Sequence, residues 1–407
     1  MSDKRVVLAF SGGLDTSFCV PYLREQGYEV ITMFVDTGGV DAEELEYIEK
    51  RAEELGAAEH VTVSGADDIW REVVVPLIWG GKFYQDQYPL LCSDRYVIVR
   101  LALKLCRERG IKYFAHGCTG MGNDQVRFDL TVRALGDFEI LAPIREIQQE
   151  VDNVRHYERE YLEERGFSVR AKTTRYTINE NVLGVTISGS EIDRFEAPGE
   201  ETYQITSRPK DWSDTPIEAT LTFENGVATE LDGEALEGPE LLSRLNARFG
   251  KAGVGRAMYT GDTTIGLKGR IVFEAPGIVS LMVAHRALEE AILTNHQNSF
   301  KPVVASKWVE LVYKGFFYEP LKIDLETFLE SSQRFIQGKV TLSAVGGQVY
   351  AVKVDSDRIL HHAGAVYAQS ADWGATEAEG FIKLYGQSSA LSAQINPLDL
   401  LEQAREE

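Results

Sequence analysis

A short apolar segment near the start of the chain leads directly into a turn of small and polar residues. Residues 6–10 read VVLAF, and residues 11–17 read SGGLDTS. A strand that ends in a glycine turn before a helix exposes backbone N–H groups at the positive end of the helix dipole, where anions bind. Because Gly12 and Gly13 have no Cβ, phosphate oxygens can approach the main chain closely. The loop hydroxyls add donors, and Asp15 is suited to a divalent cation. We therefore predict a phosphate-binding loop.

This loop differs from the common loop of enzymes that transfer the γ-phosphate of ATP. That loop reads GxxxxGK[ST], and its lysine reaches the β- and γ-phosphates. Residues 11–17 contain no lysine, which argues against ordinary γ-phosphate transfer. The SGG-x-D-[ST] pattern resembles instead the N-type ATP pyrophosphatases, which hold the pyrophosphate part of ATP during attack on the α-phosphorus. The alternative is a surface corner that binds no ligand.

The first 165 residues alternate strand and helix patterns. Pro21 lies inside the first predicted helix and is expected to kink or delay it. The alternation predicts an α/β fold with a doubly wound parallel sheet, whose ligands bind at the carboxyl ends of the strands. Residues 11–17 and 116–124 both follow predicted strands, so both loops should open on that edge. The predicted strands are 6–10, 29–35, 60–63, 112–115 and 139–142, and the predicted helices are 18–26, 42–55, 67–78 and 94–109.

The pattern changes after about residue 166. Asn225-Gly226 and Gly346-Gly347 each separate two short strand-like runs and predict hairpins. Helices are predicted over 281–293 and 303–337, so residues 166–371 should form an α+β domain. Residues 372–407 read as a terminal arm ending in a helix over 398–407.

Composition limits the partners and the location. With 63 acidic and 42 basic residues the net charge is −21, which disfavours a nucleic-acid partner. No apolar run reaches membrane-spanning length, and the early strand leaves no room for a signal peptide, so we expect a cytoplasmic protein. The four cysteines show no metal-ligand spacing. We therefore expect no metal site built from protein ligands alone.

The second loop, residues 116–129, reads HGCTGMGNDQVRFD. Arg127 offers a planar fork for a carboxylate, and Asp124 suits an ammonium group. A loop that carries both charges together with the amide of Asn123 is what an amino-acid ligand requires. The alternative is a polar loop whose charges pair with one another.

The two loops together resemble the argininosuccinate synthase family. Softer matches continue at residues 88–93, 176–186, 253–256 and 307–313. The resemblance implies a ligase in which the ureido oxygen of citrulline attacks the α-phosphorus of ATP, and the amine of aspartate then displaces AMP. It also implies a homotetramer, with residues 1–165 as the ATP-binding domain, 166–371 as the synthetase and multimerisation domain, and 372–407 as an oligomerisation arm.

The resemblance also assigns residues to ligands, position by position. ATP, with Mg²⁺ on its phosphates, would be held by Ala9, Phe10, Ser11, Gly12, Gly13, Leu14, Asp15, Thr16, Ser17, Val35 and Gly117. Aspartate would be held by Thr119, Asn123 and Asp124. Citrulline would be held by Tyr88, Ser93, Asn123, Arg127, Thr177, Thr186 and Phe273. Asp15 and Asp124 are the two residues expected to take part in catalysis.

Four segments depart from the family pattern: residues 260–264, 272–275, 91–92 and 177–181. Gly261 stands where most members have a glutamate, and Phe273 stands where they have a tyrosine. A lost charge-assisted hydrogen bond to an ammonium costs roughly 1.5–3 kcal/mol, or about ten- to a hundredfold in affinity. Either Asp262 or Glu274 substitutes for the missing acid, or the acceptor is a citrulline whose amine is masked, such as an N-acylcitrulline.

Two other functions fit the phosphate loop. One is an RNA-modifying enzyme that adenylates a base, which the charge of −21 disfavours. The other is a nucleotide sensor that binds ATP without releasing pyrophosphate under any mixture of amino acids.

Overall fold

The computed structural model describes residues 4–169, 176–361, 367 and 369–396. The chain forms two compact units, residues 1–358 and residues 359–407, which are described separately. The helix predicted over 398–407 lies outside the described residues.

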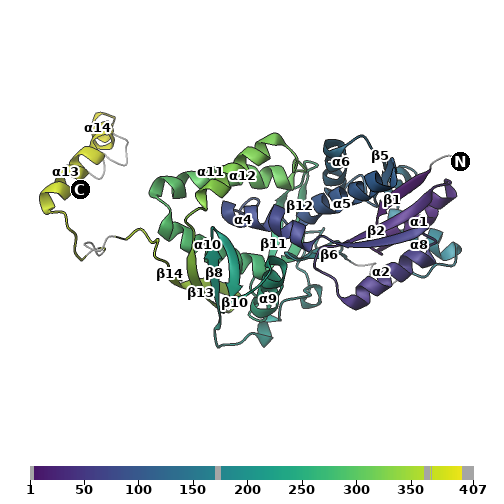
Figure 1. The fold of residues 1–407 in the computed structure, drawn as a ribbon, viewed down its shortest axis with the longest axis horizontal. Coiled ribbons are helices and arrows are strands. Elements are labelled where there is room, and N and C mark those ends of the chain that lie inside the picture. Colours follow the sequence, from purple (N-terminus) through teal and green to yellow (C-terminus); the bar gives the residue numbers. More distant parts are fainter. Residues whose placement is uncertain (1–3, 170–175, 362–366, 368, 397–407) are drawn as a thin grey trace. The chain divides into compact units, whose positions relative to one another are not determined.

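A five-stranded parallel sheet forms the centre of the amino-terminal part, as the alternating pattern predicts (Figure 1). Its order is β3-β2-β1-β4-β5. The chain therefore builds outward from β1 on one side and then returns to place β4 on the other side. This reversal creates a switch point between β1 and β4, where ligands of such sheets bind. The strands are β1 (Arg5–Ala9), β2 (Glu29–Asp36), β3 (Glu59–Ser64), β4 (Tyr113–Ala115) and β5 (Glu139–Leu141).

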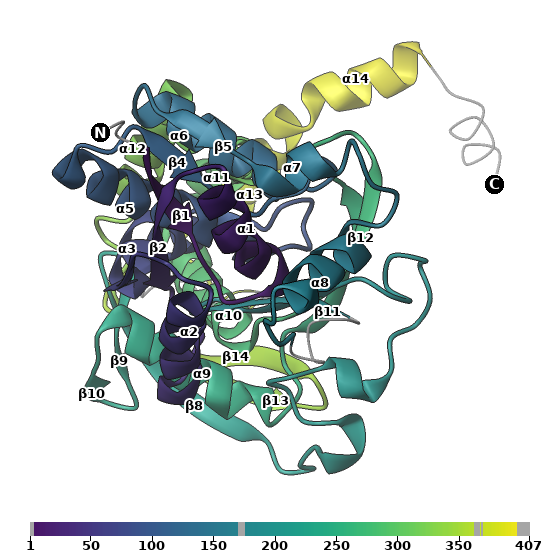
Figure 2. The ribbon, with the colours of Figure 1, turned by 90° about the vertical axis from the view of Figure 1, so that its right-hand side faces the viewer.

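Helices cover both faces of this sheet (Figure 2). Val6 and Leu8 of β1 face a core shared with α1, α2 and α8, and Val7 faces a second core shared with α5 and α6. Alternate residues of a strand point to opposite faces, so β1 is apolar throughout. The helices are α1 (Leu14–Glu25), α2 (Ala42–Glu54), α3 (Ala66–Ile69), α4 (Val75–Gly80), α5 (Asp94–Arg109), α6 (Asp124–Leu135), α7 (Pro143–Ile147) and α8 (Val154–Glu164).

Three helical predictions need correction. The first helix begins at Leu14 and contains Pro21, so the proline does not delay its start. Helix α6 follows directly on Asn123, within the stretch that the glycines suggested was entirely loop. The long helix predicted over 303–337 is two helices, because Gly315 adopts a left-handed conformation with a φ of 99° and Pro320 then starts a new helix.

The rest of the first unit contains two antiparallel sheets and four longer helices. Both predicted hairpins are confirmed and lie in one sheet of order β10-β9-β8-β13-β14, and the other sheet has the order β11-β12-β7-β6. The strands are β6 (Thr177–Asn181), β7 (Gly184–Ser188), β8 (Ile217–Glu224), β9 (Val227–Leu231), β10 (Glu234–Ala235), β11 (Arg256–Asp262), β12 (Lys268–Glu274), β13 (Gly338–Val345) and β14 (Gln348–Asp355). The helices are α9 (Gly238–Gly250), α10 (Pro276–Ile292), α11 (Asn295–Tyr313) and α12 (Pro320–Ser332).

A buried polar network anchors the segment that follows α4. Lys301 of α11 pairs with Glu289 of α10, and its ammonium group donates to the carbonyl oxygen of Trp79 at 2.6 Å. Gln333 donates to Glu289 at 2.8 Å, and its side-chain oxygen lies 2.9 Å from Nε2 of His285. A buried charge is stable only when paired and hydrogen-bonded. The network therefore fixes the end of α4, from which the chain continues into residues 82–90 of the candidate site.

Burial lowers the pKa of His285, against the opposing effect of the Glu289 carboxylate, while Lys301 and Arg286 also disfavour its charge. The unfolded chain takes up a proton as the pH falls through about 6.5, whereas the folded chain resists it. We expect the wild-type protein to lose up to about 1.4 kcal/mol of stability per pH unit below that value. Between pH 7.5 and pH 5.5, the Tm of His285→Gln should fall less than the Tm of the wild type. An equal fall in the two proteins would contradict this prediction.

The second unit contains α13 (Ala375–Tyr385) and α14 (Gln387–Ile395), and neither helix has a buried residue. Phe381 is 62% exposed and stacks on Tyr385, which is 80% exposed. Within the described part of the chain, no helix combines the length and apolarity needed to cross a bilayer.

Candidate active site

The phosphate loop forms a compact turn between β1 and α1. Gly12 has a φ of 71°, a left-handed conformation that favours glycine, and Gly13 caps the helix in extended conformation. The Ser11 hydroxyl lies 3.2 Å from that of Thr16, and the Ser17 hydroxyl donates to the carbonyl oxygen of Gly12 at 3.3 Å. The side chains therefore hold the turn closed, and the N-terminal amides of α1 remain directed out of the turn.

The second loop packs against the first. A Cβ at position 117 would lie 3.1 Å from Cγ2 of Thr16 and 3.3 Å from its main-chain nitrogen, so a larger residue than Gly117 would crowd the first loop. His116 accepts from the main-chain N–H of Cys118 at 3.1 Å and bonds Asp129 at 3.0 Å. This histidine is buried and orders the loop. Both loops lie at the carboxyl edge of the sheet, beside the switch point between β1 and β4, as predicted.

A pair of carboxyl groups lies beside the phosphate loop. Asp15 is half-buried at the start of α1, and Glu158 of α8 is 0% exposed. Neither carboxylate oxygen of Glu158 has a hydrogen-bond partner among the described residues. Burial and the charge of Asp15 raise the pKa of Glu158 to about 9, and the nearby Arg155 opposes the rise. The pair thus carries an excess of negative charge that Arg155 only partly offsets, and its carboxylate oxygens are of the type that binds a divalent cation.

The charges of the second loop pair with one another and with α5. The Asp124 carboxylate accepts from Arg127 at 2.7 Å and from Arg95 at 3.1 Å. Nη1 of Arg95 also donates to both carboxylate oxygens of Asp94, at 2.6 and 2.7 Å. Arg127 is 2% exposed and donates to the carbonyl oxygen of Tyr313 at 3.0 Å. Burial raises the pKa of Asp124, but the two guanidinium groups bring it below its ordinary value. The cluster therefore keeps Asp124 ionised.

Aromatic rings border this charged cluster. Tyr88 and Phe273 are buried with their ring centroids 5.7 Å apart, and Thr186 is the cross-strand neighbour of Phe273. The hydroxyl of Ser93 is buried and has no partner among the residues described here. Since buried hydroxyls are nearly always hydrogen-bonded, this one is suited to receive a ligand.

The remaining predicted residues lie in different parts of the site. Asn123 accepts from the main-chain N–H of Thr264 at 2.9 Å, which joins the second loop to the segment between β11 and β12. Thr177 is exposed and accepts from Arg155 at 2.6 Å, so it lies on the side of the phosphate loop rather than among the aromatic rings. Val35, Ala9, Phe10 and Leu14 are buried at the sheet, and Thr119 is half-buried in the second loop.

Several residues of the site were missed in the sequence. Asp94 and Arg95 were assigned only to a helix, although two adjacent buried charges in an apolar helix are a signal of a polar site. Arg155 and Glu158 lie in α8, whose charged sequence resembles an ordinary exposed helix. Tyr313 was noted only as part of a family match, and Gln85, which donates to Asp262 at 2.7 Å, carried no local signal.

Two family models match the chain and together cover most of it. The model described as the arginosuccinate synthase N-terminal HUP domain matches residues 5–167, and that described as the arginosuccinate synthase C-terminal domain matches residues 176–392. A parallel sheet with a lysine-free phosphate loop beside its switch point defines a nucleotide-binding domain of the N-type ATP pyrophosphatase class. The chain belongs to the argininosuccinate synthase family.

Curated relatives agree over nearly the full length. The argininosuccinate synthase of Xanthomonas campestris pv. campestris is 63% identical over 396 residues, which cover 97% of this chain and 100% of the relative. That of Xylella fastidiosa is 59% identical over 396 residues, covering 97% and 99%. That of Pyrococcus furiosus is 38% identical over 393 residues, covering 95% and 94%. The family predicted from the two loops is confirmed.

Proposed function

We propose that this chain joins citrulline and aspartate into argininosuccinate, with conversion of ATP into AMP and pyrophosphate. In the first step the ureido oxygen bonds the α-phosphorus, and the bond from that phosphorus to pyrophosphate breaks. In the second step the aspartate amine bonds the ureido carbon, AMP leaves with the ureido oxygen, and the amine loses a proton. The observation that carries the proposal is the packing of a lysine-free phosphate loop against a loop with a buried acid–base cluster.

The phosphate loop is proposed to bind the pyrophosphate part of ATP. The turn at Gly12 and Gly13 leads into α1, whose first N–H groups have no acceptor within the helix, and the hydroxyls of Ser11 and Thr16 lie in the same loop. Asp15 and Glu158 fit Mg²⁺, because they offer carboxylate oxygens and Glu158 has no other described partner. When bound, the metal would neutralise charge on the leaving pyrophosphate.

The second loop is proposed to hold the two amino acids. Asp124 is ionised and suits the ammonium group of aspartate; Asn123 directly precedes it, and Thr119 lies earlier in the same loop. Tyr88, Ser93 and Thr186 form the proposed citrulline side. Catalysis on this arrangement consists mainly of positioning two reactants and stabilising charge on the phosphates.

A pyrophosphate-release assay with ATP and Mg²⁺ tests this function. We expect no release with ATP alone, and argininosuccinate together with AMP when citrulline and aspartate are both present. Formation of ADP and orthophosphate would overturn the proposal, and ATP binding without pyrophosphate release would favour the sensor.

The same assay distinguishes the two acceptors. The alternative acceptor is N-acetylcitrulline, suggested by the absence of an acid at Gly261. We expect kcat/KM to be higher for free citrulline by tenfold or more, on the order of one ammonium contact. A preference for N-acetylcitrulline would establish the alternative.

Assembly, domain boundaries and location are also proposals. We propose a homotetramer in which residues 372–407 pack on neighbouring subunits, because α13 exposes Phe381, Ile382 and Tyr385. Light scattering in solution measures the subunit number. We keep residues 1–165 and 166–371 as the ATP-binding and synthetase domains. A cytoplasmic location fits the use of ATP and the four free cysteines.

A further inference from the structure

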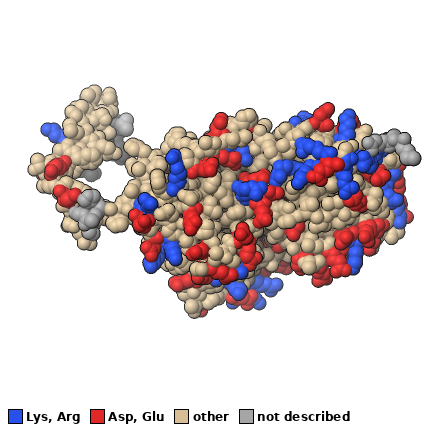
Figure 3. Space-filling view, in the orientation of Figure 1, with Lys and Arg blue, Asp and Glu red and all other residues tan. Residues whose placement is uncertain are grey.

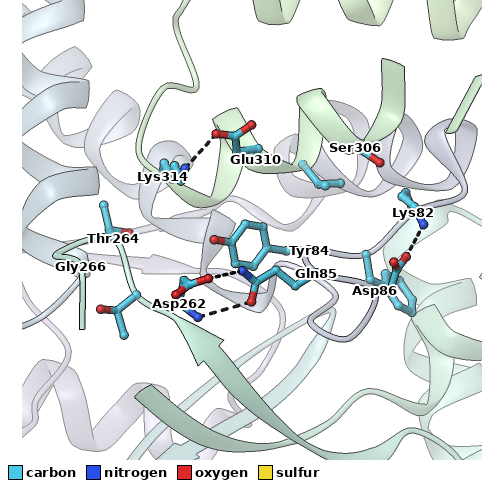
Figure 4. A pocket seen from close by; sticks show the side chains of 13 residues that line it. Lys82, Tyr84, Gln85, Asp86, Asp262, Thr264, Gly266, Ser306, Glu310 and Lys314 are labelled. Atoms are coloured by element: carbon cyan, nitrogen blue, oxygen red, sulfur yellow. Dashed lines mark hydrogen bonds and ion pairs between the residues drawn. The ribbon is translucent and has the colours of Figure 1, made fainter. Parts of the chain in front are cut away.

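A cavity of about 500 Å³ opens beside the aromatic rings of the site. Residues 82–86, the strand end at Asp262–Thr264, and helix α11 line it (Figure 4). Lys314 and Glu310 of α11 pair at 2.8 Å on one wall, and Asp262 lies on another. The cavity therefore presents groups of both signs, as the headgroup of an amino acid requires.

The cavity adjoins the proposed acceptor site at two points. Thr264, which lines it, donates its main-chain N–H to Asn123. Tyr84, another lining residue, stacks on Tyr313 with ring centroids 3.8 Å apart, and the carbonyl oxygen of Tyr313 holds Arg127. The lining of the cavity is thus connected to Asn123 through Thr264, and to Arg127 through Tyr84 and Tyr313.

Gln85 occupies the space left by the glycine at position 261. A Cβ on Gly261 would lie 2.3 Å from Oε1 of Gln85 and 2.5 Å from the hydroxyl of Tyr259. The Gln85 side chain instead accepts from that hydroxyl at 2.8 Å and donates to Asp262 at 2.7 Å. Figure 4 shows its amide directed at Asp262. Absence of a side chain at 261 therefore lets Gln85 hold the next residue, Asp262.

The backbone at Gln85 and Asp86 is strained. Gln85 and Asp86 have φ values of 49° and 60°, which residues other than glycine rarely adopt. Such strain persists only where surrounding contacts impose it, and it concentrates at functional sites. Here the contacts with Tyr259 and Asp262 impose the conformation.

Glu274, the other acid considered as a substitute, is already satisfied. It is fully buried, and its carboxylate accepts from the main-chain N–H groups of Gln204 at 2.6 Å and Thr206 at 2.9 Å, and from the Thr206 hydroxyl. By contrast, Asp262 is exposed to the cavity, and hydrogen bonds from Lys268 and Gln85 lower its pKa. Asp262 is therefore an ionised carboxylate with lone pairs available to a ligand.

We propose that Asp262, positioned by Gln85, receives the α-ammonium group of the acceptor and so selects free citrulline over acceptors that lack it. This inference rests on the proposed ligase function. Lys314 lies in the same cavity and offers a cation near the acceptor's carboxylate.

The test compares citrulline with 5-ureidopentanoate, which has the same ureido group and carboxylate but no amine. For the wild type, kcat/KM should favour citrulline by tenfold or more. Asp262→Asn should raise KM for citrulline about tenfold, change kcat by less than threefold, and bring the preference close to one, because the missing charge matters only to an ammonium group. Asp262→Glu should restore part of the preference. Gln85→Ala should lower the preference for citrulline less than Asp262→Asn does, because this variant frees the Asp262 carboxylate from its hydrogen bond but does not remove the carboxylate.

Asp86→Asn is the matched control. Asp86 lines the same cavity and pairs with Lys82, and asparagine tolerates its left-handed backbone. This variant should keep the wild-type preference. If the wild type uses citrulline and Asp262→Asn keeps both KM and preference, the inference is wrong and the ligase function stands. If the wild type releases no pyrophosphate with citrulline, the ligase function itself is wrong.

Discussion

Asp15→Asn should reduce pyrophosphate release by a hundredfold or more, a magnitude typical of the loss of one preorganised electrostatic contact. Asp15 lies in the first turn of α1, beside the main-chain amides of the phosphate loop and close to Glu158. Loss of its charge leaves the proposed magnesium with one fewer anionic ligand. The measurement is the rate of pyrophosphate release with ATP, citrulline and a range of Mg²⁺ concentrations, and the variant should require more Mg²⁺.

Asp67→Asn is the control for this variant. Asp67 lies in the first turn of α3 and is exposed. It should release pyrophosphate at the wild-type rate and with the wild-type Mg²⁺ requirement. Undiminished turnover of Asp15→Asn would remove Asp15 from the proposed mechanism.

Asp124→Asn should lower both stability and the affinity for aspartate. The half-buried carboxylate joins the buried Arg95 and Arg127, and its loss removes the carboxylate partner of Arg127, whose guanidinium group also contacts the carbonyl oxygen and ring of Tyr313. Loss of hydrogen bonds to a charged group at this half-buried position costs about 1.5–3 kcal/mol, so the Tm should fall by roughly 3 °C or more. KM for aspartate should rise at least tenfold, on the order of one charge-assisted contact to an ammonium group.

Asp129→Asn separates the two effects. Asp129 lies on the same helix and pairs with His116 and Arg145, so its loss should also lower the Tm. It is not placed near aspartate, and KM for aspartate should change by less than threefold. A fall in Tm for Asp124→Asn with an unchanged KM for aspartate would show that Asp124 is structural only.

Local sequence patterns were sufficient for the sheet and the two loops. The five parallel strands follow from short apolar runs separated by helical periodicity, and Gly12, Gly13 and Gly117 mark two turns, of which the one at Gly117 packs closely against the other loop. These signals act within a few residues, so they can be read without knowing the fold. The same is true of the hairpin at Asn225-Gly226.

Helix boundaries were less secure where local signals conflicted. Pro21 suggested a late start for α1, yet the helix includes it, because packing of Phe18 and Leu23 against the sheet core outweighs one missing hydrogen bond. The glycines before Asn123 concealed α6, whose buried face contains Phe128 and Val132.

Arrangement of the charges at the site was decided by tertiary structure. Gln85 and Asp262 are 177 positions apart, and Arg127 and the carbonyl of Tyr313 are 186 apart. No periodicity or spacing connects such residues, because their contact depends on how residues 82–90, strand β11 and helix α11 pack together. The chain's own pattern thus showed which chemical groups are present and predicted where phosphate should bind. Only the packed molecule showed that Glu274 is already satisfied while Asp262 is held open to a cavity.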